Sequence, residues 1–272
     1  MAKGGVKRAS PGADDEKDSN PLSNVELSEE DAKKLTEAQR ELGRLELVMD
    51  ILSQQKLLPA LEKRREVLKT IEKFWPVALM KNSLFSFYCQ HSADQLALSY
   101  LEDVWVTRDS TEHRCFTLEF YFKENPFFTN NVLKKQYKYI APPNADTKPD
   151  ADGITAAMLD FSWERDVEAQ AFKIDWKEPE KALTKLYPRK DGETMDDDDD
   201  EIIDMGSLFN FFELAPDTND LGVTIANEIF SEAIEHFLGE VDDDEVDSDE
   251  EDDDDDAEEI DLEKPRSKKQ KV

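Results

Sequence analysis

The sequence predicts an α+β protein in which one long N-terminal helix precedes a domain with a four-stranded antiparallel sheet. A heptad stripe of apolar residues runs through 28–75, and several segments after residue 100 alternate apolar and polar side chains. Such alternation is typical of a half-buried antiparallel strand, whereas the heptad stripe is typical of helices that pack together. We divide the chain into a disordered N-terminal arm (1–27), the long dimerisation helix (28–75), an α+β domain (76–239) and a disordered acidic tail with a basic end (240–272).

The long helix begins with Ser28, whose spacing from Asp31 resembles a capping box. Apolar residues then recur at alternating spacings of three and four, and Pro59 interrupts the pattern, so we expect a kink or a division of the helix there. The stripe consists of Leu35, Ala38, Leu42, Leu45, Met49, Leu52, Leu61, Leu68, Ile71 and Trp75.

This stripe needs a partner. A continuous helix over 28–75 would span about 72 Å, which is too long to pack inside a domain of this size. One possibility is an antiparallel helical hairpin within the chain. We favour pairing between two chains, because no second segment of matching length is available to cover the stripe.

Strands are predicted after a stretch of short helices and loops at 77–99. The segments 100–107, 114–123 and 132–140 are rich in β-branched and aromatic residues, and 114–123 alternates most clearly. A fourth strand is predicted around Phe172, Ile174 and Trp176. The intervening residues 141–153 form a turn-rich loop, and 207–213 is a compact aromatic cluster. The pattern from Asp220 to Leu238 predicts an amphipathic helix that ends at Gly239.

The composition restricts the classes of function. The formal charge is −31, so the protein cannot grip nucleic acid through bulk positive charge, and we expect basic partners and no sequence-specific nucleic-acid binding. Two cysteines are too few for a disulfide framework, and no apolar run approaches 18 residues, which indicates a soluble protein of a reducing compartment that does not bind membranes.

Few residues suggest catalysis. The sequence contains no phosphate-binding glycine motif and no nucleophile elbow, so we expect no enzyme and no cofactor. One alternative is a small metal-dependent enzyme with zinc held by Cys89, His91, His113 and Cys115. Neither pair has the usual ligand spacing, and we therefore expect no metal site.

The acidic tail has two interpretations. Residues 240–272 contain 18 acidic and five basic side chains, and a tail of this kind can simply keep a protein soluble. Alternatively, it is a flexible polyanion for a basic protein. Extended, its acidic part at 240–263 carries about 0.22 charges per Å, against about 0.6 per Å for duplex DNA. It would therefore shield a DNA-binding protein and release it to DNA.

Several ordered segments carry a resemblance to a known family. These are FW at 74–75, LALSYLEDVWVT at 96–107, FYFKENPFF at 120–128, NNVLKKQY at 130–137, IDWKE at 174–178, SLFNFFE at 207–213 and NDLGVTIANEIF at 219–230. Together they resemble the SET / nucleosome assembly protein family, and the short chain with a lone acidic tail is most similar to the SET / template-activating-factor branch. Lys123 stands where the family often has an acidic residue.

The resemblance implies a homodimer in which the long helices pair and each subunit carries an earmuff domain with a four-stranded sheet. It implies a histone chaperone for nucleosome assembly and disassembly and for histone masking, acting on core histones through acidic earmuff surfaces and the tail. Phosphatase inhibition or transport adaptation is the alternative. The candidate histone-binding residues are Glu124, Asp175, Glu178, Asp196, Asp197, Asp198, Asp252, Asp253, Asp254, Asp255 and Asp256.

The basic C-terminal end predicts a nuclear protein that can shuttle to the cytoplasm. Five basic side chains within eight residues are a candidate nuclear localisation signal, although they can also pair with the adjacent acidic tail. They are Lys264, Arg266, Lys268, Lys269 and Lys271.

Overall fold

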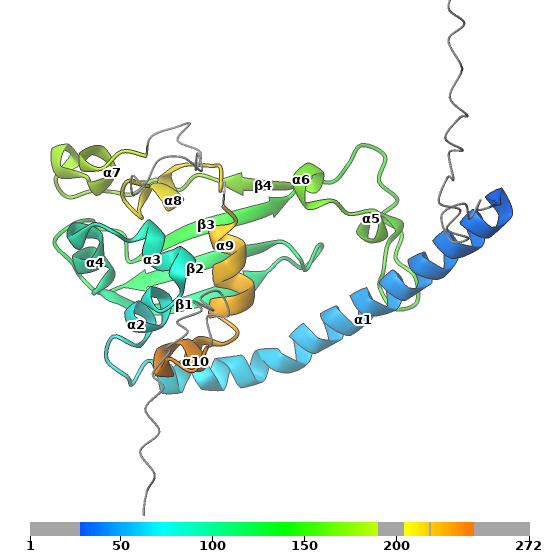
Figure 1. Ribbon diagram of the computed structural model, residues 1–272, viewed down its shortest axis with the longest axis horizontal. Helices are drawn as coiled ribbons and strands as arrows, with labels where there is room; N and C mark the ends of the chain where they lie inside the picture. Colours follow the sequence, from blue (N-terminus) through cyan, green and yellow to red (C-terminus); the bar gives the residue numbers. More distant parts are fainter. Residues whose placement is uncertain (1–27, 190–203, 218, 242–272) are drawn as a thin grey trace, which may run out of the picture.

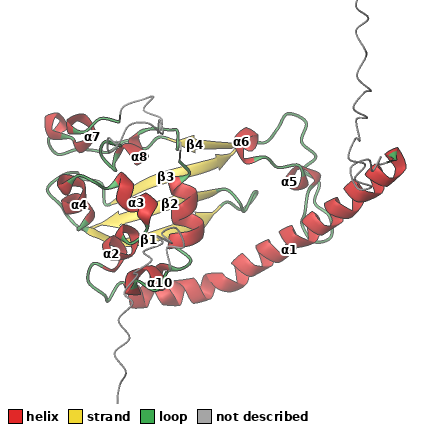
Figure 2. Cartoon of the chain, viewed as in Figure 1, coloured by secondary structure: helices red, strands yellow, loops and turns green. Residues whose placement is uncertain are grey.

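The computed structural model describes residues 28–189, 204–217 and 219–241 and confirms the predicted α+β class. Figures 1 and 2 show one long helix, α1 (Glu29–Leu68), that extends away from a domain built on a single sheet. Two predicted segments, the N-terminal arm and the acidic tail beyond residue 241, lie outside the described residues.

Helix α1 begins where the sequence predicts. The Ser28 hydroxyl accepts a hydrogen bond from the Asp31 backbone N–H at 3.1 Å, as an N-cap should. Of the kink or division expected at Pro59, the division is wrong, because α1 runs unbroken through this residue. Packing of Leu61 and Leu68 against the domain holds the helix together across the missing N–H.

The predicted end of the helix at Trp75 is also wrong. α1 ends at Leu68, and the chain turns through Lys73, whose φ of 57° is left-handed. This turn directs Phe74 and Trp75 into the core as the start of a separate helix, α2 (Phe74–Met80). Trp75 continues the heptad spacing in the sequence, but its side chain packs in the core of the domain and not on the stripe of α1.

The sheet contains four antiparallel strands in the order β1-β2-β3-β4. β1 (Leu101–Arg108), β2 (Phe116–Phe122) and β3 (Val132–Tyr139) confirm the three strands predicted first. Along β2, each second side chain from Phe116 to Phe122 is buried, so the alternation marks one core-facing side of the sheet.

The fourth strand differs from the prediction. β4 is Val167–Gln170 and pairs with β3, whereas Phe172, Ile174 and Trp176 lie beyond it. These three side chains do alternate in burial, because the segment is extended and packs beside 127–129. Only the isolated bridge between Phe128 and Trp176 forms there. The period of two therefore identified an extended segment and not a strand of the sheet.

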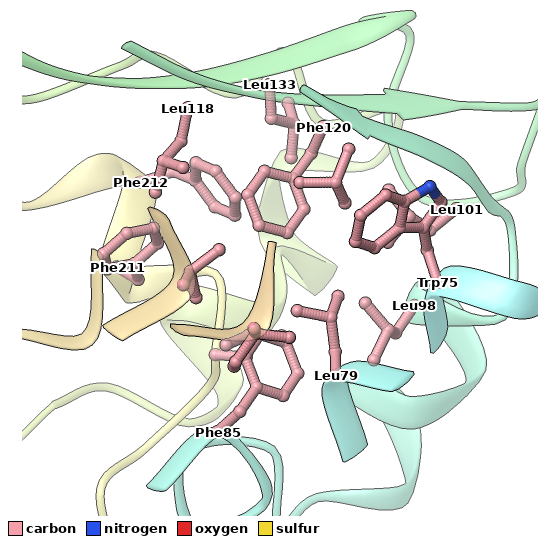
Figure 3. Packing of buried hydrophobic residues seen from close by; sticks show 14 of the residues in the cluster. Trp75, Leu79, Phe85, Leu98, Leu101, Leu118, Phe120, Leu133, Phe211 and Phe212 are labelled. Atoms are coloured by element: carbon pink, nitrogen blue, oxygen red, sulfur yellow. The ribbon is translucent and has the colours of Figure 1, made fainter. Parts of the chain in front are cut away.

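The core lies between one face of the sheet and a layer of short helices. Figure 3 shows Phe211, Phe212, Trp75, Leu79 and Phe85 all facing the same side of the sheet. The helices of this layer are α2, α3 (Ser83–Tyr88), α4 (Ser92–Leu98), α8 (Asn210–Glu213) and α9 (Leu221–Thr224). Further short elements are α5 (Ala156–Leu159), α6 (Trp163–Asp166), η1 (Pro179–Lys181) and α7 (Leu183–Leu186).

The helix predicted over 220–238 is divided. α9 leads into a π-helical segment, η2 (Ile225–Ile229), and α10 (Ala233–Leu238) follows after a turn. Leu221, Ile225 and Ile229 are buried as the pattern predicted, and Gly239 ends α10 with a φ of 73°. The wide π turn keeps these side chains on the core while the chain changes direction before α10.

Candidate dimerisation helix and acidic surface

An apolar stripe on α1 has no partner in the described part of the chain. Its side chains are between 44% and 63% exposed, which is unusual for large apolar residues arranged in a continuous row. The stripe consists of Leu35, Leu42, Leu45, Met49 and Leu52. These are the predicted dimerisation residues of the N-terminal half, and the structure leaves them free for another helix.

The opposite face of α1 is held by its own domain. The Arg44 guanidinium forms ion pairs with Asp150 and Asp152 of the loop before α5, the first at 2.7 Å. Arg40 lies 3.4 Å from Asp160, and Leu47 is buried. Figure 1 shows this loop and α5 lying along α1 far from its C-terminal end. These contacts place the free stripe on the outer side of the helix.

The C-terminal part of the predicted stripe has a different role. Leu68 is buried in the core of its own domain, so its assignment to dimerisation is corrected. Leu61 packs against that core but is only partly buried, and it stays a predicted dimerisation residue. Ile71 lies beyond the end of α1 and is 39% exposed. Near the sheet, the apolar residues that continue the heptad pattern pack against their own domain.

Arg65 shows how this end of α1 is fixed. Its Nε lies 2.5 Å from Asp103 Oδ2, and its guanidinium covers the rings of Trp105 and Tyr121 at 4.5 and 5.0 Å from their centroids. Burial raises the pKa of Asp103, and the neighbouring Arg65 opposes that rise. A bulge in β1 between Leu101 and Asp103 gives this carboxylate its position.

Three predicted histone-binding residues lie near one end of the sheet. Glu124 belongs to the loop between β2 and β3, and this loop is joined to the segment of Asp175 and Glu178 by the 2.8 Å hydrogen bond from Lys177 N–H to the Phe127 carbonyl. All three carboxylates are exposed. Asp175 and Glu178 have lysine partners, Lys173 at 3.3 Å and Lys181 at 2.7 Å.

The structure therefore brings the three acidic residues to one region, where lysine side chains partly neutralise Asp175 and Glu178. Surface ion pairs of this kind contribute about 0–1 kcal/mol, so a basic partner can replace the lysines.

The remaining predicted binding residues cannot be placed. Asp196, Asp197 and Asp198 lie outside the described residues, as do Asp252 to Asp256 and the five basic residues of the C-terminal end.

The residues of the zinc hypothesis are placed in other roles. Cys89 and Cys115 are buried free thiols, and burial raises the pKa of each to about 12. His91 Nε2 lies 2.9 Å from Asp204 Oδ1, and its ring stacks on Tyr187. Among the described residues no cluster of three or more His, Cys, Asp or Glu side chains could hold a metal ion.

Several buried polar residues position the helices around the sheet, and sequence analysis missed them. Asp94 of α4 accepts hydrogen bonds from the Ser207 hydroxyl at 2.6 Å and the Leu208 N–H at 2.9 Å, and burial raises its pKa. Lys135 of β3 is fully buried, and its Nζ donates to the Leu214 and Ala215 carbonyls at 2.6 and 2.9 Å. Lys135 occupies a core-facing position in the alternation of β3, which was the available signal.

Comparisons with known proteins agree with the resemblance stated from the sequence. The family model described as "Nucleosome assembly protein (NAP)" matches residues 22–265. This chain belongs to the nucleosome assembly protein family. The family is thereby shown, while assignment to the SET / template-activating-factor branch stays a prediction.

The chain is 31% identical over 188 residues to Nucleosome assembly protein 1;2 of Oryza sativa subsp. indica, covering 65% of this chain and 49% of the relative. It is 27% identical over 199 residues to Nucleosome assembly protein 1-like 1-A of Xenopus laevis, covering 65% and 47%. This family member thus spans about half the length of the curated relatives it matches.

Solved structures share its fold. Crystal structures of a Ccp1 mutant and of Vps75 both align with a TM-score of 0.55, at 21% and 16% sequence identity. They cover 76% and 78% of this chain and 93% and 98% of theirs. In the described part of this nucleosome assembly protein family member, no helix has the length and apolar character needed to cross a bilayer.

Proposed function

We propose that this protein is a histone chaperone that works by binding in nucleosome assembly and disassembly and catalyses no reaction. The observation that carries this proposal is the family match over residues 22–265 in a chain whose formal charge is −31. Core histones are strongly basic, and a polyanionic protein attracts them and competes with DNA for their positive surfaces.

The binding surface of the proposal combines a folded part and a tail. Glu124, Asp175 and Glu178 offer exposed carboxylates near one end of the sheet, and the segments around 196–198 and 252–256 add dense acidic runs. A tail with a lower charge density than DNA would hold a histone in solution and yield it to DNA. Masking of histones against other proteins would follow from the same contacts.

Dimerisation through α1 is the second part of the proposal. The exposed stripe from Leu35 to Leu52 supports it, because a partner helix would remove five large apolar side chains from water. The proposal requires no cofactor. It places the protein in the nucleus, with shuttling to the cytoplasm, through the basic C-terminal end.

The decisive experiment compares the full chain with a variant that lacks residues 240–263. Binding of H2A–H2B dimers and H3–H4 tetramers is measured by competition at several salt concentrations. We expect weaker binding with a smaller salt slope but not its loss, since residues 1–239 still carry −18. A basic protein of equal charge but unrelated fold is the control.

Three results would contradict parts of the proposal. Absence of histone binding by the full chain would exclude the chaperone function. Complete loss on truncation at physiological salt would show that the folded surface contributes little. Binding that is unchanged by truncation would reduce the tail to a solubilising segment, as in the adaptor alternative.

A further inference from the structure

Gly43 lies in the interior of α1, where no contact within the described residues requires a glycine. An added Cβ would meet nothing within 4 Å, and the residue keeps ordinary helical geometry. Glycine in a helix interior costs about 1 kcal/mol relative to alanine. No close approach within the described residues explains this cost, so the space above Gly43 is open.

Glu46 and Asp50 impose a second local cost beside it. Like charges four residues apart on a helix repel each other. Both side chains are exposed, and neither carboxylate has an ion pair or hydrogen bond within the described residues. The charge of Asp50 does act on the ring of His113, but burial lowers the pKa of that ring, which disfavours a compensating positive charge. At 100° per residue, Gly43, Glu46 and Asp50 lie within about 60° of one another on α1, away from Arg44, and Glu46 borders the apolar stripe.

This face lines a crevice of about 500 Å³ between α1 and the domain. Its apolar wall consists of Leu47, Met158 and Leu159. The two basic residues of the crevice are already neutralised: Arg40 lies 3.4 Å from Asp160, and Arg114 is paired with the buried Glu112 at 2.6 Å.

The charge that the crevice leaves uncompensated is therefore negative. Figure 1 shows α5 beside the N-terminal half of α1, and Met158 and Leu159 of α5 line the crevice. Its size is that of a pocket for a small ligand or a short peptide segment.

We propose that this crevice binds an arginine or lysine side chain of a basic protein segment. The aliphatic stem would lie along Leu47 and Met158 above Gly43, and the cationic group would bind between Glu46 and Asp50. A basic ligand explains the missing side chain at 43 and the two like charges together. The inference rests on the proposed function, because histones are the basic partners considered.

The test uses the full chain and a fluorescent 12-residue peptide of alternating arginine and alanine. The variant Glu46→Gln with Asp50→Asn is compared with Glu37→Gln plus Glu41→Gln, which removes the same charge at the same spacing outside the crevice. We expect about tenfold weaker binding for the first variant, as befits the loss of a charge-assisted contact, and less than twofold for the second.

A second set of variants changes volume without charge. Gly43→Leu fills the crevice and should weaken peptide binding about as much, whereas Gln55→Leu on another face of α1 should not. Gly43→Ala should bind normally and raise the Tm, which separates helix stability from binding.

Equal weakening by the two charge variants, or normal binding by Gly43→Leu, would overturn the proposal. A change in the mass of the dimer with Gly43→Leu would also overturn it, by showing that a second copy of the chain fills the crevice. Failure of the wild type to bind histones while it binds the peptide would count against the chaperone function alone.

Discussion

At the scale of single residues, β3 fixes the position of the loop that leads into α9. Its core-facing Lys135 holds the Leu214 and Ala215 carbonyls, and Tyr137 donates a hydrogen bond to Asp217. Asp217 in turn accepts from the Leu221 and Gly222 N–H groups at 3.1 and 2.8 Å. Two polar side chains within the core therefore connect the sheet to the helical layer.

Gly222 is required by this arrangement. A Cβ at this position would overlap the Tyr137 hydroxyl and ring, and Tyr137 is buried and hydrogen-bonded, so it cannot move aside. We expect Gly222→Ala to destabilise the protein by about 2–3 kcal/mol, as overpacked cores do. Urea unfolding measures this effect. Gly43→Ala, where the added methyl group meets only open space, should have the opposite sign, and stabilisation by both variants would contradict the argument.

Lys135 makes stability depend on pH. Burial lowers its pKa to about 8 in the folded protein from 10.5 in the unfolded chain. Between these values the unfolded chain binds more protons, so stability must rise with pH. Relative to Lys135→Met, the wild type should gain up to about 3 kcal/mol between pH 8 and pH 10.5.

Urea unfolding of both proteins across this range provides the measurement. The two buried cysteine thiols also change their ionisation in the unfolded chain at alkaline pH, but they are common to both proteins and cancel in the difference. A difference that stays constant or falls with pH would exclude the assignment.

These residue-level contacts could not be predicted from the sequence. The alternation of β3 predicts that position 135 faces the core, but lysine is the residue least expected there. Its partners are backbone carbonyls 79 and 80 residues away, and no side-chain pattern reveals them. Asp94 was missed for the same reason, since its partners belong to the distant 207–208 segment.

At the scale of elements, periodicity predicted the type of structure better than its limits. The heptad pattern predicted α1, but the domain core claims Leu68 and Trp75, which the pattern assigned to the seam. Similarly, the alternation of Phe172, Ile174 and Trp176 is real, but these residues pair only once with the β2–β3 loop. Periodicity reports which side chains are buried, and only tertiary packing decides what buries them.

The free stripe of α1 leads to a prediction about assembly. Replacing Leu42 and Leu45 with glutamate would place like charges opposite one another in a paired seam, at a cost of several kcal/mol. Analytical ultracentrifugation should then show monomer or unfolded chain. Glutamate at Leu57 and Leu58, which are exposed on other faces of the same helix, is the matched control and should leave the dimer intact. An unchanged dimer mass in the first variant would exclude the stripe as the interface.

At the scale of the whole molecule, charge is divided between an acidic chain and a short basic end. The last 33 residues carry −13, although five of the last nine are basic. Exposed pairs between the basic end and the neighbouring carboxylates are weak, so an import receptor with acidic pockets can compete for the basic residues.

We expect that alanine at Lys264, Arg266, Lys268, Lys269 and Lys271 abolishes nuclear accumulation of the tagged protein. A dimer of 31.2 kDa chains is too large to equilibrate quickly by diffusion. Fluorescence imaging provides the measurement, with alanine at Lys7 and Arg8 as the comparison. Undiminished accumulation would assign import to that N-terminal pair or to transport together with histones.

The attachment of α1 has a mechanical consequence. The helix rests on two supports, the domain core at Leu68 and the loop that binds Arg44, about 36 Å apart along its axis. The first support is apolar and includes the shielded Arg65–Asp103 pair, whereas the second depends on more exposed ion pairs, so salt weakens the second support more than the first. A shift of about 3 Å there would turn the helix by about 5°, and in a paired assembly the spacing between the two domains would change with ionic strength.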